Sequence, residues 1–156
     1  MPDQAALAAT QSSNLSDLQL IAAPAIMPVG GSLTKTSKIL IVDDEPNVTI
    51  ILQRVLSSLP NSDIMAVYNP LDALQLFEQT QVDLVITDYK MPQLNGVILA
   101  TRLKTIAPQV NIIMLTACDE YELHQQINDR SAIQHILSKP TPPHKLRQLV
   151  SAVLDL

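Results

Sequence analysis

From residue 38 onward, short apolar runs alternate with longer stretches in which apolar residues recur every three or four positions. The runs lie at Ile39–Val42, Ile64–Tyr68, Leu84–Thr87, Ile112–Leu115 and Ile133–Leu137, the last of them interrupted by polar residues. A continuous apolar run of this length is typical of a strand buried on both faces. Successive strands joined by helices pair in parallel, with right-handed crossovers. The alternation therefore predicts an α/β fold, a doubly wound five-stranded parallel sheet flanked by five helices.

Local signals mark the starts of the expected helices. Pro46 suits a first helical turn, Asn69-Pro70 combines an N-cap with a first-turn proline, and Asn95-Gly96 is a turn signal. The stretches with helical spacing are 48–59, 71–77, 97–106, 119–129 and 146–154. The fourth of them has the thinnest apolar face, so its helix is the least clearly indicated.

Composition narrows the range of functions. Hydrophobic residues make up 47% of the 156 residues, which suffices for one compact core, but aromatic residues make up only 3%. That scarcity argues against sites built on aromatic stacking, such as an RNA-binding sheet. A net charge of −5 gives no bulk attraction to nucleic acid or to an anionic membrane. The single cysteine excludes an internal disulfide and no apolar stretch is long enough to span a membrane, so we expect a cytoplasmic protein.

Residues 1–37 differ from the rest of the chain. They are rich in Ala, Ser, Gln and Thr, and they contain Pro24, Pro28 and the pair Gly30-Gly31. Such a composition is typical of flexible segments. We therefore expect a flexible N-terminal extension, residues 1–37, followed by a folded domain, residues 38–156. A short docking or dimerisation helix around residues 15–21 is the alternative for the extension.

Polar side chains follow four of the five expected strands. Asp43 and Asp44 follow the first strand and Asp88 follows the third, while Thr116 and Lys139 end the fourth and fifth. The carboxyl ends of parallel strands form the ligand-binding edge of such a sheet, so these side chains should converge there. Neighbouring carboxylates repel each other unless a cation joins them, and oxygen ligands suit Mg²⁺ or Mn²⁺. A lysine and a hydroxyl beside them suit a phosphoryl group, so the set describes phosphoryl transfer to an aspartate.

Four segments carry a resemblance to a known family. They are Ile39–Glu45 (ILIVDDE), Val85–Gly96 (VITDYKMPQLNG), Ile112–Ala117 (IIMLTA) and Ile136–Pro140 (ILSKP). In this order and at this spacing, they resemble the receiver domain of two-component response regulators, the CheY-like superfamily. The resemblance covers residues 38–156 and implies the flavodoxin-like receiver fold.

The resemblance also implies roles for the acidic residues. Asp88 falls at the position of the phosphoacceptor. Asp43 and Asp44 match the acidic pair that holds Mg²⁺ together with Asp88, with Asp44 and Asp88 expected as the direct side-chain ligands, and the backbone carbonyl of Lys90 should complete the protein ligands. Phosphorylation would add about two negative charges beside Asp88.

Further positions match the part of the family that responds to phosphorylation. Thr116 matches the switch hydroxyl, Lys139 the lysine that pairs with the phosphoryl group, and Pro140 the proline that commonly follows a cis bond. Ile136 occupies the position where the family usually has a switch Tyr or Phe, so the resemblance does not imply the usual aromatic readout here. Thr116 and Lys139 would gain charge-assisted hydrogen bonds to the phosphoryl group only in the phosphorylated state.

The sequence thus predicts a regulatory phosphoacceptor that takes a phosphoryl group from a histidine kinase or a histidine phosphotransfer protein, not an enzyme acting on other substrates. Its output would be a downstream effector protein, or an output domain of a longer chain, and a homodimer stays open. A receiver-like interaction module that works without phosphorylation is one alternative. An Mg²⁺-dependent hydrolase with an aspartyl-phosphate intermediate is the other, although such enzymes have an Asp-x-Asp after the first strand, and here the acids are adjacent.

Overall fold

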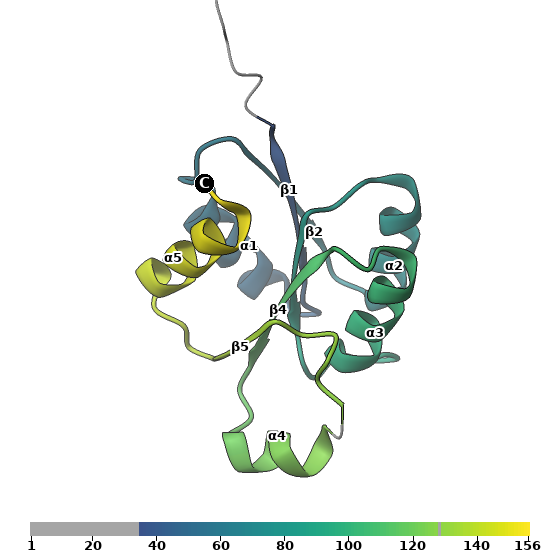
Figure 1. Cartoon of the computed structure of the whole chain (residues 1–156). Helices are drawn as coiled ribbons and strands as arrows, with labels where there is room; N and C mark the ends of the chain where they lie inside the picture. The colour runs from purple at the N-terminus through teal and green to yellow at the C-terminus, as the bar shows by residue number, and fades with distance from the viewer. Residues whose placement is uncertain (1–34, 128) are drawn as a thin grey trace, which may run out of the picture. The chain divides into compact units, whose positions relative to one another are not determined.

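The computed structural model describes residues 35–127 and 129–156, in which five strands and five helices alternate along the chain (Figure 1). The strands are β1 (Ser37–Val42), β2 (Ser62–Val67), β3 (Leu84–Asp88), β4 (Asn111–Thr116) and β5 (His135–Ser138). The helices are α1 (Pro46–Leu56), α2 (Pro70–Gln79), α3 (Gly96–Ile106), α4 (Glu120–Gln126) and α5 (Pro143–Leu154). The helix considered around residues 15–21 lies outside the described residues.

The five strands form one parallel sheet in the order β2-β1-β3-β4-β5. This arrangement confirms the predicted doubly wound α/β fold. β1 and β3 are neighbours at its centre although they are far apart in the sequence, and their residues are almost all buried. The polar residues at the carboxyl ends of these two strands are therefore brought side by side near the centre of the edge.

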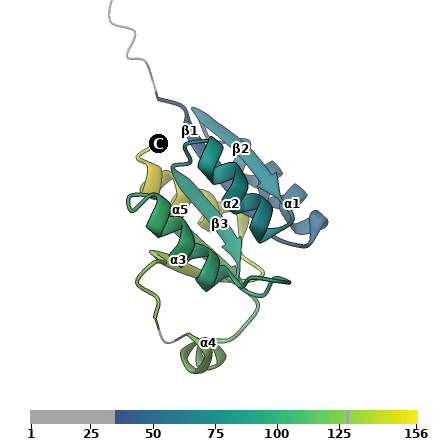
Figure 2. The same cartoon turned by 90° about the vertical axis from the view of Figure 1, so that its right-hand side faces the viewer.

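Two apolar clusters hold the helices on opposite faces of the sheet (Figures 1 and 2). Ile39 and Ile41 of β1 pack with α1 and α5, whereas Leu40 and Val42 pack with α2 and α3. Side chains alternate between the faces of a strand, so β1 contributes to both clusters. The buried residues are almost entirely aliphatic, as the scarcity of aromatic residues predicts.

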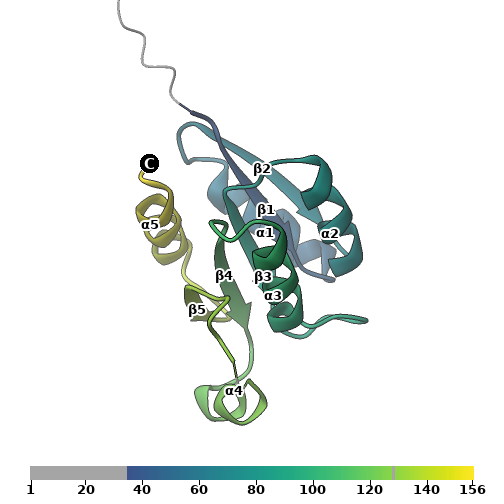
Figure 3. The same cartoon turned by 45° about the vertical axis from the view of Figure 1, so that its right-hand side comes forward.

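Helix α4 is set apart from the other helices, beside the carboxyl end of β4 (Figure 3). It has seven residues and ends at Gln126, three residues before the expected end. A third, smaller cluster of buried side chains packs against it, formed by Tyr89, Met114, Cys118, Leu123 and Ile127. We call this set the α4 cluster.

The fifth strand is shifted from its expected position of 133–137 to 135–138. The side-chain oxygen of Gln134 accepts a hydrogen bond from the backbone N–H of Ile112 at 2.6 Å. The backbone N–H of Gln134 also donates to the carbonyl of Ile112 at 3.0 Å, and strand pairing begins at the next residue, with His135 opposite Ile113. Ile133 lies before the strand, where its N–H donates to the carbonyl of Arg130.

No helix in the described ranges combines the length and the hydropathy that crossing a membrane requires.

Candidate functional site

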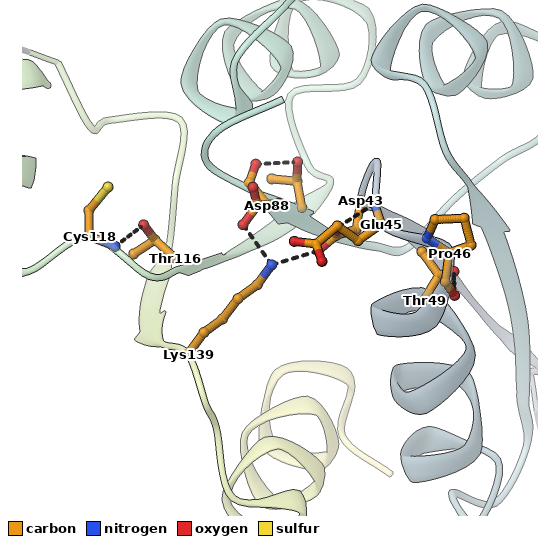
Figure 4. A network of polar contacts seen from close by, with 9 residues as sticks. Asp43, Glu45, Pro46, Thr49, Asp88, Thr116, Cys118 and Lys139 are labelled. Carbon is orange, nitrogen blue, oxygen red and sulfur yellow. Dashed lines mark hydrogen bonds and ion pairs between the residues drawn. The ribbon is translucent and has the colours of Figure 1, made fainter. Parts of the chain in front are cut away.

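Three of the predicted site residues meet at the carboxyl edge of the sheet (Figure 4). The ammonium nitrogen of Lys139 lies 2.6 Å from Oδ2 of Asp43 and 2.8 Å from Oδ1 of Asp88. The side chain of Asp43 is 2% exposed and that of Asp88 is 11% exposed. One lysine thus pairs with two carboxylates that are largely removed from water, and it offsets one of their two negative charges.

Strand register explains why these residues meet. Val42 of β1 lies opposite Thr87 of β3, so the next residues along the chain, Asp43 after β1 and Asp88 at the end of β3, lie at the same level of the carboxyl edge. On the other side of β4, the backbone N–H of Lys139 donates to the carbonyl of Thr116 at 2.7 Å. This bond continues the pairing of β4 and β5 by one residue and directs the lysine along the edge towards the acids.

The two carboxylate oxygens of Asp43 have different partners. Oδ2 pairs with Lys139, and Oδ1 accepts the backbone N–H of Glu45 at 2.9 Å. Glu45 precedes α1, whose first turn begins at Pro46. Asp43 therefore joins the start of α1 to the site.

Gly96 allows α3 to approach the backbone of Asp88 very closely. A Cβ atom at this position would lie 2.2 Å from the carbonyl oxygen of Asp88, well inside contact distance. The N–H of Gly96 donates to the carbonyl of Tyr89 at 2.8 Å, and the side chain of Asn95 caps the helix by accepting the N–H of Ile98. The sequence indicated a turn at Asn95-Gly96 but not that this glycine supports the site.

Burial and charge act on Asp88 in opposite directions. Burial raises the pKa of Asp88 above its ordinary value of 3.8, and the hydrogen bond and charge of Lys139 lower it, with burial prevailing. Burial lowers the pKa of Lys139, but its contacts with Asp43 and Asp88 outweigh that effect and raise it above 10.5. Lys139 is therefore held as a cation, whereas burial makes Asp88 a weaker acid than an exposed aspartate.

A cavity of about 230 Å³ opens at the site, and it brings in residues from β4 and α4. Of the predicted residues, Asp88, Lys90, Thr116 and Lys139 line it, and Cys118 and Glu122 lie beside them. Thr116 is buried, and its Oγ1 accepts the backbone N–H of Cys118 at 3.0 Å. In Figure 4 its side chain lies towards Cys118 and not against Asp88.

Lys90 is an exposed member of this cavity. A hydrogen bond to the side chain of Cys118, and then the charge of Glu122, raise the pKa of Lys90. The sequence did not indicate Glu122 as a site residue, because its place on the cavity wall depends on where α4 lies and not on a local motif.

The remaining predicted residues lie around this centre. Asp44 is exposed and is not among the residues that line the cavity. The peptide bond between Lys139 and Pro140 is cis. Ile136 is half-buried and packs against the α4 cluster.

The donors at this edge fit Mg²⁺. Asp43 and Asp88 already hold a cation between them, the ammonium of Lys139, so their carboxylates converge on one position. Within the described ranges, no three His, Cys, Asp or Glu side chains form a group that could hold a metal. Mg²⁺ is commonly bound by one or two carboxylates with water completing its shell, so two side chains with a backbone carbonyl suffice.

The chain matches the model of the response regulator receiver domain over residues 39–151. It is 32% identical over 119 residues to the sporulation initiation phosphotransferase F of Bacillus subtilis, covering 76% of this chain and 94% of that protein. It is 31% identical to the cyclic di-GMP phosphodiesterase response regulator RpfG of Xanthomonas campestris, of which it spans only 32%. These matches show the family: the chain belongs to the response regulator receiver domains.

A solved structure agrees with this assignment. The signal receiver domain of an HD domain-containing protein from Pseudomonas fluorescens Pf-5 superposes with a TM-score of 0.73 at 29% identity. The match covers 81% of this chain and 93% of that one. The predicted family and its CheY-like fold are thus confirmed, and receiver domains are regulatory phosphoacceptors of two-component systems.

Proposed function

We propose that Asp88 accepts a phosphoryl group from the phosphohistidine of a histidine kinase or a histidine phosphotransfer protein, and that this modification switches the domain between two states. The observation that carries the proposal is the ion-pair arrangement of Lys139 with Asp43 and Asp88 beside a cavity at the carboxyl edge. In this arrangement the ammonium of Lys139 can exchange a contact with a carboxylate for a contact with a phosphoryl oxygen.

In this reaction a carboxylate oxygen of Asp88 attacks phosphorus as the bond from phosphorus to the donor imidazole nitrogen breaks. The bonding electrons stay on the imidazole, and an acyl phosphate forms on Asp88. Mg²⁺, held by Asp44, Asp88 and the backbone carbonyl of Lys90, with Asp43 as the second acid of the pair, would neutralise charge on the transferred group. Mn²⁺ has the same ligand preferences.

Lys139 and Thr116 supply the response to the new charge. The ammonium of Lys139 leaves its ion pair with Asp88 oxygen and pairs with a phosphoryl oxygen, a charge-assisted contact. The hydroxyl of Thr116 donates to another phosphoryl oxygen. Since neither contact exists without the phosphoryl group, both shift the equilibrium towards the second state.

An apolar groove beside the site suits the approach of the phosphodonor protein. Val48, Ile51 and Leu52 of α1 line it with Lys139, Pro140 and Thr141, and its volume is about 370 Å³. Ile51 is 59% exposed. Since Lys139 belongs to both the groove and the site, a protein seated there would hold its histidine near Asp88.

The proposed receiver domain comprises residues 38–156, preceded by the extension 1–37. We propose a cytoplasmic location from its place in two-component signalling. Its output would pass through an effector protein or a further domain, and a homodimer is one form that this could take.

The test is labelling of Asp88 with acetyl phosphate, followed by intact-mass measurement. We expect one Mg²⁺-dependent phosphoryl adduct in the unchanged protein, none in Asp88→Asn, and no adduct in EDTA. Asp83→Asn is the matched control, because Asp83 precedes the same strand at its opposite end, and it should label normally.

Two results would contradict the proposal. Labelling that persists in Asp88→Asn would place the phosphoryl group elsewhere. A folded protein without any adduct would favour a receiver-like interaction module that works without phosphorylation.

A further inference from the structure

Helix α4 is held to the domain by a small set of side chains. Leu123 of α4 and Ile127 at its end are 4% and 6% exposed, and both belong to the α4 cluster. The other members are Tyr89, Met114 and Cys118. Tyr121, on the other side of the helix, is 74% exposed. The position of α4 therefore depends on packing within the α4 cluster.

Tyr89 connects this cluster directly to the phosphoacceptor. It follows Asp88 in the chain, and its side chain is only 6% exposed. Its backbone N–H donates to the carbonyl of Leu115 at 3.1 Å and also bonds the carboxylate of Asp88, which lowers the pKa of Asp88. Its carbonyl accepts the N–H of Gly96. A change at the Asp88 carboxylate thus acts on a residue whose ring packs in the cluster that holds α4.

Cys118 makes a second connection from the same site to the same cluster. Its N–H donates to Oγ1 of Thr116, and its side chain is buried in the α4 cluster. If the Thr116 hydroxyl turns to a phosphoryl oxygen, this hydrogen bond is lost just before α4 begins. Asp88 through Tyr89, and Thr116 through Cys118, are thus both connected to α4 by one group of buried side chains.

The ring of Tyr89 is the aromatic ring of the α4 cluster. Ile136, which packs against the cluster from β5, is aliphatic, and the whole chain has only three tyrosines, one phenylalanine and no tryptophan. A planar ring fills a different space when its backbone rotates, whereas a short aliphatic side chain adapts with little effect on its neighbours. Within the α4 cluster, the Tyr89 ring is therefore the side chain whose orientation most affects its neighbours.

We propose that Tyr89 is a positioning residue that transmits the state of Asp88 to helix α4, in place of an aromatic side chain at position 136. This inference rests on the proposed phosphorylation of Asp88. The expected consequence is that phosphorylation changes the packing of α4 and the presentation of its exposed side, which carries Tyr121.

The test compares hydrogen exchange of residues 119–127 with and without Mg²⁺ and beryllofluoride, a stable mimic of the phosphoryl group. In the unchanged protein we expect the exchange rates of this segment to change about fivefold or more. Tyr89→Leu should still form the acetyl phosphate adduct, but its α4 segment should exchange at the same rate in both states. Tyr89→Phe keeps the ring and should keep the response, and Tyr68→Leu, which removes an exposed tyrosine, is the matched control.

A second readout uses the small number of tyrosines. In a chain carrying Tyr68→Phe and Tyr121→Phe, all tyrosine fluorescence comes from Tyr89, and it should change on addition of beryllofluoride with Mg²⁺. If Tyr89→Leu does not fold, Tyr89→Met replaces it, since methionine fills irregular apolar space.

The outcomes separate the two proposals. An unchanged response of α4 in a folded Tyr89→Leu variant, or an α4 segment that does not respond in the labelled unchanged protein, overturns the role of Tyr89 and leaves phosphorylation intact. A purely structural role would alter exchange equally in both states. Absence of any adduct in the unchanged protein overturns the proposed function, and the transmission through Tyr89 with it.

Discussion

The ammonium nitrogen of Lys139 lies 2.6 Å from a carboxylate oxygen of Asp43, a residue 96 positions earlier in the chain. Asp43 is almost completely buried, and a buried charge without a partner strongly destabilises a fold. Lys139 therefore has a structural role, as well as the role proposed for it in contacting the phosphoryl group.

Replacing this lysine should make the domain depend on metal. Lys139→Met leaves Asp43 and Asp88 without their cation, which we expect to lower the free energy of unfolding by about 3 kcal/mol in EDTA. Mg²⁺ should then raise the melting temperature of the variant more than that of the unchanged protein, because no ammonium competes for the carboxylates. Thermal unfolding across a range of Mg²⁺ concentrations measures both effects.

The control for this experiment is Lys145→Met, which removes an exposed lysine from α5. It should unfold like the unchanged protein at every Mg²⁺ concentration. An equal response to Mg²⁺ in both lysine variants would show that Lys139 and the metal do not share a position.

At the opposite edge of the sheet, Asp83 should give a pH-dependent contribution to stability. Burial alone would raise its pKa, but hydrogen bonds from the side chain of Lys35 and the backbone of Lys38 outweigh burial and lower it below 3.8. A lowered pKa in the folded state means that the contribution is complete above pH 3.8 and is lost as the pH falls below it. Asp83→Asn should therefore destabilise the protein by about 1 kcal/mol at pH 7 and by progressively less under acid.

Denaturant unfolding between pH 7 and pH 3 would measure this difference. Asp63→Asn, which changes an exposed aspartate on β2, serves as its control and should show no such trend. A gap between Asp83→Asn and the unchanged protein that stays constant down to pH 3 would contradict the ion-pair explanation.

Gly96→Ala should disturb the site through the backbone. The added methyl group would lie 2.2 Å from the carbonyl oxygen of Asp88, so either α3 or the end of β3 must move. We expect a loss of about 2 kcal/mol of stability, typical of overpacking, together with slower labelling of Asp88 by acetyl phosphate. Ile98→Ala alters an exposed position in the same helical turn and should label at the normal rate.

Thr116→Val should reveal the hydrogen bond that its hydroxyl oxygen accepts. Valine has nearly the same shape but offers no oxygen, so the N–H of Cys118 loses its acceptor in a buried setting, at a cost of about 1 to 3 kcal/mol. Thr116→Ser keeps the oxygen and should be close to the unchanged protein. Chemical denaturation of both variants measures the difference in the free energy of unfolding. Equal stability of Thr116→Ser and Thr116→Val would argue against this bond.

The central part of the fold was predictable because its signals are local. Runs such as Ile39–Val42 are apolar without alternation, and a parallel sheet then requires that Asp43, Asp88 and Lys139 meet at one edge. The structure brings these three side chains together. Their roles in phosphoryl transfer and metal binding stay predictions until they are tested.

The features that escaped prediction depend on contacts between distant segments. Just before β5 begins, the Gln134 side chain bonds to β4, and no pattern within residues 133–137 indicates that bond. Likewise, Glu122 reaches the cavity only because of where α4 packs, and Gly96 matters because α3 approaches Asp88. A motif indicates which residue is present, but close approach between elements is decided by the packing of the whole domain.

The order of the site residues along the chain has a consequence during biosynthesis. A ribosome adds Asp43 and Asp88 well before Lys139, which belongs to the last strand-to-helix connection of the domain. Until that segment emerges and pairs with β4, the two acids lack their counterion. Burial of the unpaired Asp43 carboxylate then disfavours packing of the sheet around it. The edge that is proposed to receive the phosphoryl group is therefore assembled only when the final strand has paired with β4.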